Sequence, residues 1–560
     1  MRKALLTVVT TAATLFGLTV VLPPGAGAGT ESVEYAVLYA SDASTANARA
    51  AVQHAGGTLL SENLDVGLAT VRTTRTDFVR AVSRESALYG AAHNRPVGYA
   101  PKDERASRDQ VEREGRSRGG ARTGPKRGPE PLASLQWDMD MIGAPAAHKV
   151  QAGDKRVLVG VIDTGIDGSH PDIAPNFDKD LSRNFTTDIP LIDGPCADEA
   201  DGSCNDANDV DEDGHGTHVA GTIASPLNGI GIAGVAPKVT LVNIRAGQDS
   251  GYFFIQPTVD ALTYAADIGV DVVNMSFYID PWLYNCPNGA PEDSPDAVAE
   301  QRTIIEATQR ALNYAHRKGV TLVGASGNEH TDLGHVSTDA TSPDYPPDAA
   351  YDRTVDNTCL DLPTEGNHVL SVNSVGPTKV KADYSNYGLE QASVAAPGGF
   401  FRDYLGTPQN RVDANLILAP YPTAVGIAAG DIDANGEPTT TAVVKDCTKV
   451  CSYYQWIQGT SMAAPHVVGV VALIVSEYGQ KDPNHKGGLT MRPYEVENVL
   501  FRTATATPCP DPADFSYVPY GRTWTNTCEG TANFNGFYGH GIVNALAAVS
   551  EDHGQGNGHH

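Results

Sequence analysis

The chain has 560 residues, of which 41% are hydrophobic and 19% charged, a composition that fits a globular protein with a sizeable core. Its formal net charge of -27 argues against a nucleic-acid partner, because a phosphate backbone favours a basic surface. The length exceeds one average domain and accommodates a large α/β domain with a smaller one beside it.

Residues 1–28 have the pattern of a secretory signal peptide. Arg2 and Lys3 precede an apolar run, and Ala26-Gly27-Ala28 supplies the small residues that suit cleavage. A transmembrane anchor is the alternative, but threonines interrupt the run and two prolines end it. We therefore expect a secreted, extracellular protein without a membrane partner.

Eight cysteines follow, and an even number in a secreted chain predicts disulfides. The preferred pairs are close in sequence and leave one longer pair: Cys196–Cys204, Cys447–Cys451, Cys509–Cys528 and Cys286–Cys359. Other connectivities remain compatible with the sequence alone. Zinc binding is the rival interpretation, which the lack of Cys-x-x-Cys pairs disfavours.

Residues 33–100 alternate strand-like and helix-like runs. The expected order is a strand at 34–40, a helix at 44–55, two strands within 58–73, a helix at 77–86 and a strand at 96–100. This order is that of a small ferredoxin-like α+β domain. Residues 101–131 are rich in charged residues and glycine, which predicts a flexible, protease-sensitive linker rather than a charged helix.

From residue 136 to about 550, apolar strands alternate with helices. The strands are expected at 156–163, 238–246, 271–277 and 320–328, and two of the helices at 257–268 and 300–318. Such strands predict a parallel sheet with helices on both faces, whose functional residues gather at the carboxyl ends of strands. We interpret residues 400–458 as an insertion, in which 425–444 with its Asn-Gly pair predicts a hairpin.

Polar residues follow several of these strands. Asp163 ends the first strand, His215 lies between two glycines at a helix start, and Asn328 lies just past another strand. Taken alone, Asp163 could be a helix cap and Asn328 a turn residue. His215 and His218 could bind a metal as H-x-x-H, but the spacing is not that of H-E-x-x-H.

The stretch QGTSMAAPHV contains a serine at the start of an apolar helix running to Val475. Ser461 could be a simple helix cap. However, the helix N-terminus also favours an oxyanion there and leaves the backbone N–H of Ser461 free. His466 lies about 140° around the helix from Ser461, so it cannot be the base of that serine. We interpret it as a packed histidine, which makes His215 the candidate base.

The order Asp163, His215, Ser461 is one of three triad orders found in serine hydrolases, and subtilisin is the reference example of it. The surrounding motifs resemble the subtilisin-like serine protease family, appear in family order and extend from residue 136 to about 550. They are DTGIDGSHPD, HGTHVAGTIA, GIAGVAP, NMSF, GASGN and GTSMAAPHV.

The resemblance implies a subtilisin-like α/β fold and a serine endopeptidase that hydrolyses peptide bonds of protein or peptide substrates through an acyl-enzyme. Ser461 would be the nucleophile and His215 the general base and then acid, while Asp163 would orient His215. Asn328 and the N–H of Ser461 would form the oxyanion hole. No cofactor is needed for this chemistry.

The family also binds its substrate as an extended strand, which implies contacts at Ser276 and at Gly324, Ala325 and Ser326. Phe277-Tyr278 departs from the small glycines that the family usually carries there. A structural calcium site is implied near Asp172 and the loop 227–232. Residues 209–214 and 431–436 imitate the start of an EF-hand but lack the glutamate at the twelfth position.

By the same resemblance, residues 33–100 would be an inhibitor-like propeptide, so that the protein is made as a zymogen and its own propeptide blocks the groove. The mature amino terminus is expected between Arg116 and Leu135. A catalytically silent binding protein on the same scaffold is the alternative, and it would be expected to lose a triad member. A lipase or esterase would carry G-x-S-x-G, whereas the frame here is G-T-S-M-A.

Overall fold

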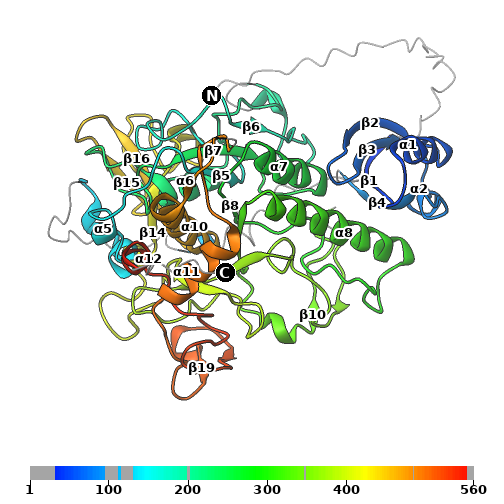
Figure 1. The fold of residues 1–560 in the computed structure, drawn as a ribbon. Coiled ribbons are helices and arrows are strands. Elements are labelled where there is room, and N and C mark those ends of the chain that lie inside the picture. Colours follow the sequence, from blue (N-terminus) through cyan, green and yellow to red (C-terminus); the bar gives the residue numbers. More distant parts are fainter. Residues whose placement is uncertain are drawn as a thin grey trace, which may run out of the picture.

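The computed structural model describes residues 32–94, 111–114, 130–198, 202–345, 349–483 and 485–551. The predicted signal peptide, the strand expected at 96–100 and most of the predicted linker lie outside these ranges. A small unit near the amino terminus packs against one side of a larger α/β unit (Figure 1).

The small unit is a four-stranded antiparallel sheet with two helices, in the order β2-β3-β1-β4. Its elements are β1 Val33–Tyr39, α1 Thr45–His54, β2 Thr58–Asn63, β3 Leu68–Thr73, α2 Phe78–Val82 and β4 Leu88–His93. The β-α-β-β-α-β order agrees with the ferredoxin-like prediction. The last described strand, β4, lies before the segment 96–100 in which a strand was expected. Its sequence LYGAAH was not predicted as a strand because its small residues give only a weak strand pattern.

Contacts between the two units run along the helices α7 Ile255–Asp267 and α8 Pro295–Arg317 (Figure 1). A Cβ at Gly90 would lie 2.2 Å from Thr303 Oγ1, so only glycine permits this approach. Arg310 Nη1 donates to Tyr39 O at 2.9 Å. The amide of Asn63 donates to α7, at 2.8 Å from an oxygen of Asp260.

The larger unit is built on a seven-stranded parallel sheet in the order β13-β12-β9-β8-β5-β7-β6. The strands are β5 Leu158–Ile162, β6 Arg183–Asn184, β7 Thr240–Arg245, β8 Val272–Met275, β9 Thr321–Ala325, β12 Val369–Val375 and β13 Val394–Pro397. The five residues of β5 are all buried, as expected for a strand covered on both faces.

Helices cover both faces of this sheet. The helices not yet given are α4 Trp137–Met141, α5 Ala144–Ala147, α6 His215–Ala224, α9 Thr423–Ala428, α10 Thr460–Tyr478, α11 Pro493–Thr503 and α12 Ala545–Ser550. One hydrophobic cluster joins the sheet to α6 and α10, and another joins it to α7 and α8. The predicted parallel sheet with helices on both faces is therefore confirmed.

Helix α10 runs through the middle of the fold. Among the described residues it is the one helix whose length and apolar composition would let it cross a membrane, but 89% of its most apolar window is buried inside the protein. We therefore assign it as the central core helix.

The insertion at 400–458 differs from the predicted hairpin. It contains a small antiparallel sheet in the order β14-β16-β15, made of Ile417–Pro420, Ser452–Ile457 and Val443–Asp446. The first arm of the expected hairpin is instead the helix α9, which follows Pro422 and ends before Gly430 at φ +74°. The turn at Gly436 remains from the prediction, closed by a single antiparallel bridge between Ile432 and Pro438.

All four predicted disulfides form: Cys196–Cys204, Cys286–Cys359, Cys447–Cys451 and Cys509–Cys528. Three short hairpins lie at the periphery. They pair β10 Thr338–Asp339 with β11 Arg353–Thr354, β17 Gln480–Lys481 with β18 Leu489–Thr490, and β19 Asp514–Ser516 with β20 Thr525–Thr527.

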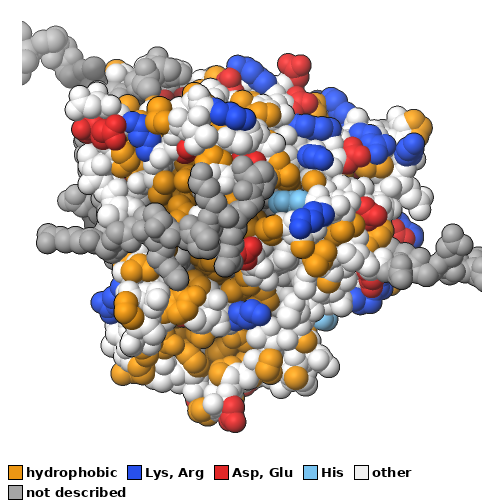
Figure 2. All heavy atoms as spheres, turned by 90° about the vertical axis from the view of Figure 1, so that its left-hand side faces the viewer, with side chains coloured by type: hydrophobic (Ala, Val, Ile, Leu, Met, Phe, Trp, Pro, Cys, Tyr) orange, Lys and Arg blue, Asp and Glu red, His pale blue; other side chains and the backbone are white. Residues whose placement is uncertain are grey.

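Figure 2 shows one face of the molecule, on which the described basic and acidic side chains lie interspersed among hydrophobic ones. This face therefore presents no extended patch of one charge sign among the described residues.

Candidate active site

The four sequence-predicted polar residues meet where the carboxyl ends of the central strands face the starts of two helices. Asp163 directly follows β5, and Asn328 lies three residues after β9. His215 is the first residue of α6, and Ser461 is the second residue of α10.

Asp163 and His215 form a hydrogen-bonded pair. His215 Nδ1 donates to Asp163 Oδ1 at 2.7 Å, and Asp163 is fully buried. The N–H of Thr164 donates to the same oxygen at 2.8 Å. A Cβ at Gly216 would lie 2.1 Å from Gly165 O, so a glycine after His215 is what lets α6 begin this close to Asp163.

Ser461 is held by reciprocal contacts with Ser276. Its Oγ lies 3.5 Å from Ser276 O, and Ser276 Oγ donates to Ser461 O at 3.1 Å. Because Ser461 lies in the first turn of a 19-residue helix, its N–H is one of the donors that the helix leaves unpaired. The partial positive charge of that helix end also favours an anion beside the serine.

Asn328 is tethered to the residue before Ser461. Its Oδ1 accepts hydrogen bonds from Thr460 N and Thr460 Oγ1, both at 3.0 Å. Since the oxygen of the amide faces Thr460, its nitrogen points away from Thr460 as a donor. Asn328 Nδ2 and the N–H of Ser461 are thus candidates to bind one developing oxyanion.

A short segment of the predicted linker lies against these residues. Glu112 Oε1 lies 3.7 Å from His215 Nε2, the ring nitrogen that faces away from Asp163. Gln458 N donates to Glu112 O at 3.1 Å, and Gln458 Nε2 donates to Val111 O at 2.9 Å. Glu114 accepts from Gln458 Nε2 at 3.2 Å. The sequence offered no signal for this contact, because the segment reads only as charged and glycine-rich.

Two arginines anchor the same segment. Arg522 Nη2 lies 3.0 Å from Glu114 Oε2, and Arg402 pairs with the other oxygen of Glu114. Both arginines also face the buried carboxylate of Asp383. Residues from three distant parts of the chain therefore hold Glu112 beside His215.

The ionisation of His215 and Glu112 is coupled through this contact. Burial lowers the pKa of His215, but the charges of Asp163 and Glu112 outweigh burial and raise that pKa well above its ordinary value. Burial raises the pKa of Glu112, but the charge of His215 and hydrogen bonds to His215 and Ser461 lower it overall. An imidazolium in this pair cannot accept the proton of Ser461, so the described arrangement is a closed one.

Two further histidines of these motifs, His218 and His466, are structural. His218 Nε2 lies 3.1 Å from the carbonyls of Ile417 and Gln455, and burial lowers the pKa of His218 to about 3. This ring fastens the insertion to α6 and does not form a metal pair with His215. His466 is fully buried, with Nδ1 2.8 Å from Met462 O and Nε2 3.1 Å from an oxygen of Asp138. It is packed, as the helix angle predicts.

The residues predicted to bind substrate all lie at or near the ends of β8 and β9. Ser276 touches Ser461 as described above. Gly324 pairs with β8 on one side and with β12 on the other, so it lies inside the sheet. Ala325 O accepts from Thr364 Oγ1 at 2.5 Å, and Ser326 Oγ donates to Asn386 O at 3.3 Å. Their contact with substrate stays a prediction.

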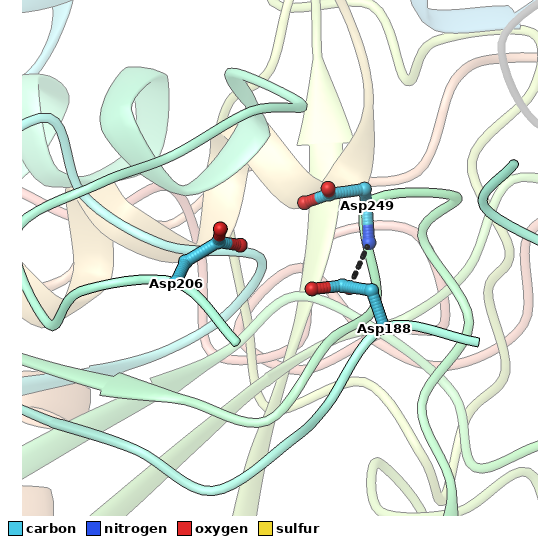
Figure 3. Close-up of side chains that lie close together, drawn as sticks. All are labelled: Asp188, Asp206 and Asp249. Atoms are coloured by element: carbon cyan, nitrogen blue, oxygen red, sulfur yellow. Dashed lines mark hydrogen bonds between the residues drawn. The ribbon is translucent and has the colours of Figure 1, made fainter. Parts of the chain in front are cut away.

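Three carboxylates face one another near β7, and the sequence did not single them out (Figure 3). Oxygens of Asp188, Asp206 and Asp249 lie within 4.8 Å of one another. Arg245 donates to all three, at 2.8 Å to Asp188 and 3.0 Å to Asp249. The guanidinium therefore supplies the cation of this cluster.

The residues near Asp172 do not fit the calcium ion that the resemblance implies. Asp172 Oδ2 accepts from Ile232 N at 3.0 Å and from the hydroxyl of Tyr454 at 3.1 Å, and Asn228 Nδ2 donates to Oδ1 at 3.2 Å. The ammonium of Lys449 donates to Asn228 O. Burial raises the pKa of Asp172 to about 8. Donors thus surround a carboxyl group that a calcium ion would need as an anionic ligand.

The sequence comparisons agree with this geometry. Residues 154–541 match the subtilase family. Subtilisin DY of Bacillus licheniformis is 29% identical over 362 residues, which cover 64% of this chain and 88% of that protein. The major intracellular serine protease of Bacillus subtilis is 30% identical, over 61% of this chain and 75% of its own length. Fervidolysin of Fervidobacterium pennivorans is 27% identical over 67% of this chain, but the match spans only 41% of fervidolysin.

Solved structures show the same fold. The epidermin leader peptide processing serine protease of Staphylococcus aureus superposes with a TM-score of 0.61 at 21% identity, covering 93% of this chain and 98% of that one. The crystal structure of fervidolysin gives a TM-score of 0.55 at 20% identity, covering 93% and 61% of the two chains. Together with the family match over residues 154–541, these findings establish that the chain belongs to the subtilase family of subtilisin-like serine endopeptidases.

Proposed function

We propose that this protein is a secreted serine endopeptidase that cleaves protein or peptide substrates through an acyl-enzyme at Ser461. The observation that carries the proposal is the 2.7 Å pair of Asp163 and His215 beside a serine at the start of α10. Asn328 adds an oriented amide donor next to that serine. The predicted signal peptide at 1–28 and the four disulfides support secretion.

The mechanism follows from these positions. Once Glu112 has left, His215 Nε2 takes the proton of Ser461 as the serine oxygen attacks the carbonyl carbon, and His215 then gives that proton to the leaving amine. Asp163 keeps the proton on Nδ1 of His215 and stabilises the imidazolium. A water activated by His215 then hydrolyses the acyl-enzyme by the same steps in reverse.

The oxyanion of each tetrahedral intermediate would be bound by Asn328 Nδ2 and the N–H of Ser461. Removing one such donor costs roughly 10²–10³ in kcat, a value measured on subtilisin itself. No cofactor enters these steps, and calcium has no part in them.

We further propose that residues 33–100 are an inhibitory propeptide, joined by the linker 101–131 to a peptidase domain at 136–550 with an insertion at 400–458. Two contacts support this organisation. The amino-terminal sheet packs on α7 and α8, and Glu112 of the linker lies against His215. Cutting within the linker would release both, giving a mature amino terminus between Arg116 and Leu135.

The direct test is hydrolysis of casein by the secreted protein. The wild-type chain should cleave casein, Ser461→Ala should not, and a matched change at the exposed Ser337, Ser337→Ala, should have no effect. A silent binding protein on this scaffold would show no hydrolysis with any of the three chains. Amino-terminal sequencing of the active material should place its start after residue 116, and an intact start at Gly29 would contradict the zymogen proposal.

A further inference from the structure

Two arginines lie beside the catalytic pair, and no step of the mechanism uses them. Arg402 belongs to the insertion 400–458, and Arg522 belongs to the loop between β19 and β20. Both bind the carboxylate of Glu114, which is part of the linker. Cleavage of the linker beyond residue 116 would release Glu114, so the processed enzyme would keep the two arginines without this carboxylate.

The rest of the described protein balances only part of the positive charge of this pair. The buried carboxylate of Asp383 binds Nε of Arg522 and lies 3.7 Å from Nε of Arg402. Within the described ranges, Asp383 and Glu114 are the carboxylates that pair with these arginines. One carboxylate cannot balance two guanidinium groups, so the pair is left with an excess positive charge once Glu114 has gone.

Both guanidinium groups are held by contacts that do not involve the linker. The ring of Trp524 lies under Arg522, with 5.3 Å between the guanidinium carbon and the ring centroid. Arg402 Nη1 donates to Tyr520 O at 3.0 Å. The disulfide Cys509–Cys528 closes the segment that carries Tyr520 and Arg522. The pair should therefore keep its place when the linker leaves, as a pre-formed site does.

Gln458 adds a neutral donor to the same site. Its Nε2 donates to Glu114 Oε2 at 3.2 Å, and its Oε1 accepts from Phe401 N at 2.7 Å, which orients the amide. Gln458 precedes Ser461 by three residues, so the Cα atoms of these two residues lie at most about 11 Å apart. A carboxylate bound here is thus within reach of a chain that Ser461 attacks.

The position of Glu112 indicates which part of a substrate reaches the arginines. In the proposed mechanism His215 gives its proton to the leaving amine, so the substrate chain after the cut passes Nε2 of His215. Glu112 Oε1 lies 3.7 Å from that nitrogen, and Glu114 follows Glu112 by two residues. The linker therefore occupies the side of the site that receives the residues after the cut.

We propose that Arg402 and Arg522 bind a carboxylate in the part of the substrate that follows the cleaved bond, so that the enzyme prefers substrates with an acidic group there. This inference rests on the proposed function and names the substrate class of the same site. The carboxylate can belong to an aspartate or glutamate side chain, or to the carboxyl terminus of a short peptide. The insertion 400–458 and the hairpin of β19 and β20 would then serve to supply this specificity.

Arginine suits this role because its planar fork binds carboxylates with strong, directional hydrogen bonds. Arg402 meets Oε1 of Glu114 and Arg522 meets Oε2, so another carboxylate can take the same place between them. A glutamine has nearly the same size as a glutamate but would leave the excess charge of the pair unbalanced. The site should therefore discriminate between these two residues.

The test measures kcat/KM of the processed enzyme on fluorogenic peptides that share the residues before the cut. In the first set the carboxyl terminus is an amide and one of the first three residues after the cut is Glu, with a matched peptide carrying Gln. In the second set all three residues are neutral, and a free carboxyl terminus is compared with an amide. The enzyme is titrated with a serine-reactive probe, so that kcat/KM refers to competent molecules.

We expect one carboxylate peptide to exceed its neutral partner by about tenfold or more, since the charged hydrogen bonds are lost in the partner. A gain in the first set assigns the site to an acidic side chain, and a gain in the second set alone assigns it to the carboxyl terminus.

Arg402→Gln and Arg522→Gln should each bring this ratio of carboxylate to neutral peptide close to one, while Arg402→Lys should retain part of it. The control Arg492→Gln removes the same charge at an exposed position just before α11 and should leave the ratio unchanged. Poor folding of a variant lowers both rates equally, so the ratio is independent of it.

A wild type that cleaves every carboxylate peptide at the rate of its neutral partner would overturn the inference. Arg402→Gln and Arg522→Gln variants with the wild-type ratio would overturn it as well. In both cases an enzyme that reacts with the probe and cleaves peptides leaves the proposed function intact. A protein that neither reacts with the probe nor cleaves any peptide would instead refute the proposed function, and this inference with it.

Discussion

Replacing Glu112 with glutamine in the full chain should open the closed site. The variant keeps the backbone bond from Gln458 N to Glu112 O but removes the charge that lies 3.7 Å from His215 Nε2. At that separation two unit charges attract by about 4 kcal/mol at an effective dielectric constant of 20. Desolvation of both groups offsets most of this, and we take about 1.5–3 kcal/mol, the range for a hydrogen bond to a charged group, as the upper range of the net loss.

The assay is the rate at which a serine-reactive probe labels Ser461 in the intact precursor, which mass spectrometry separates from processed enzyme. A loss of about 1.5–3 kcal/mol corresponds to labelling about 10- to 100-fold faster in Glu112→Gln. The matched control Glu437→Gln, at the exposed turn of the insertion, should label at the wild-type rate. Equal rates for all three chains would refute the view that Glu112 occludes the site.

The pH dependence of this labelling has a defined sign. Because Glu112 raises the pKa of His215, the closed state holds a proton more tightly than the open state does. Low pH therefore favours the closed state, and raising the pH through the raised pKa of His215 favours opening. The midpoint of labelling against pH should be lower in Glu112→Gln than in the wild-type precursor, and a higher midpoint would contradict the coupling.

Three further outcomes are expected. Asp163→Asn should lower kcat by about 10⁴, as measured for the equivalent change in a chymotrypsin-like enzyme, because His215 loses the group that fixes its tautomer; an activity within tenfold of wild type would argue against the pair. His466→Ala should lower the free energy of unfolding by about 2–4 kcal/mol, since it opens a cavity and leaves Asp138 unpaired, and urea denaturation would check this. Chelation with EDTA should leave Tm unchanged, because donors already satisfy Asp172; a large fall in Tm would restore the calcium prediction.

Several strands of the fold were predictable because each one is recognisable from the residues of its own segment. The strands β5, β7, β8 and β9 are mostly apolar runs, with single polar residues in β7 and β8, as expected for buried parallel strands. Strand β12 was missed because it contains serines and an asparagine. These polar side chains can be buried because distant segments of the chain form hydrogen bonds with them. Asn373 Nδ2, for example, donates to Gly536 O and Phe537 O.

The residues of the candidate site also fall into two groups, those that the sequence predicted and those that it did not. Asp163, His215, Ser461 and Asn328 each stand in a local motif, and the angle around α10 was enough to separate His466 from Ser461. Glu112 carries no local motif. Its position depends on contacts across more than a hundred residues of chain, which a pattern of spacing does not encode.

The central claim is that Ser461 is the nucleophile activated by His215, and covalent labelling tests it most directly. After processing, the wild-type enzyme should take up one equivalent of an irreversible serine-reactive inhibitor, found by peptide mass spectrometry on Ser461, with parallel loss of casein hydrolysis. His215→Ala should abolish both labelling and hydrolysis. Hydrolysis that survives full labelling, or a label on another serine, would contradict the account.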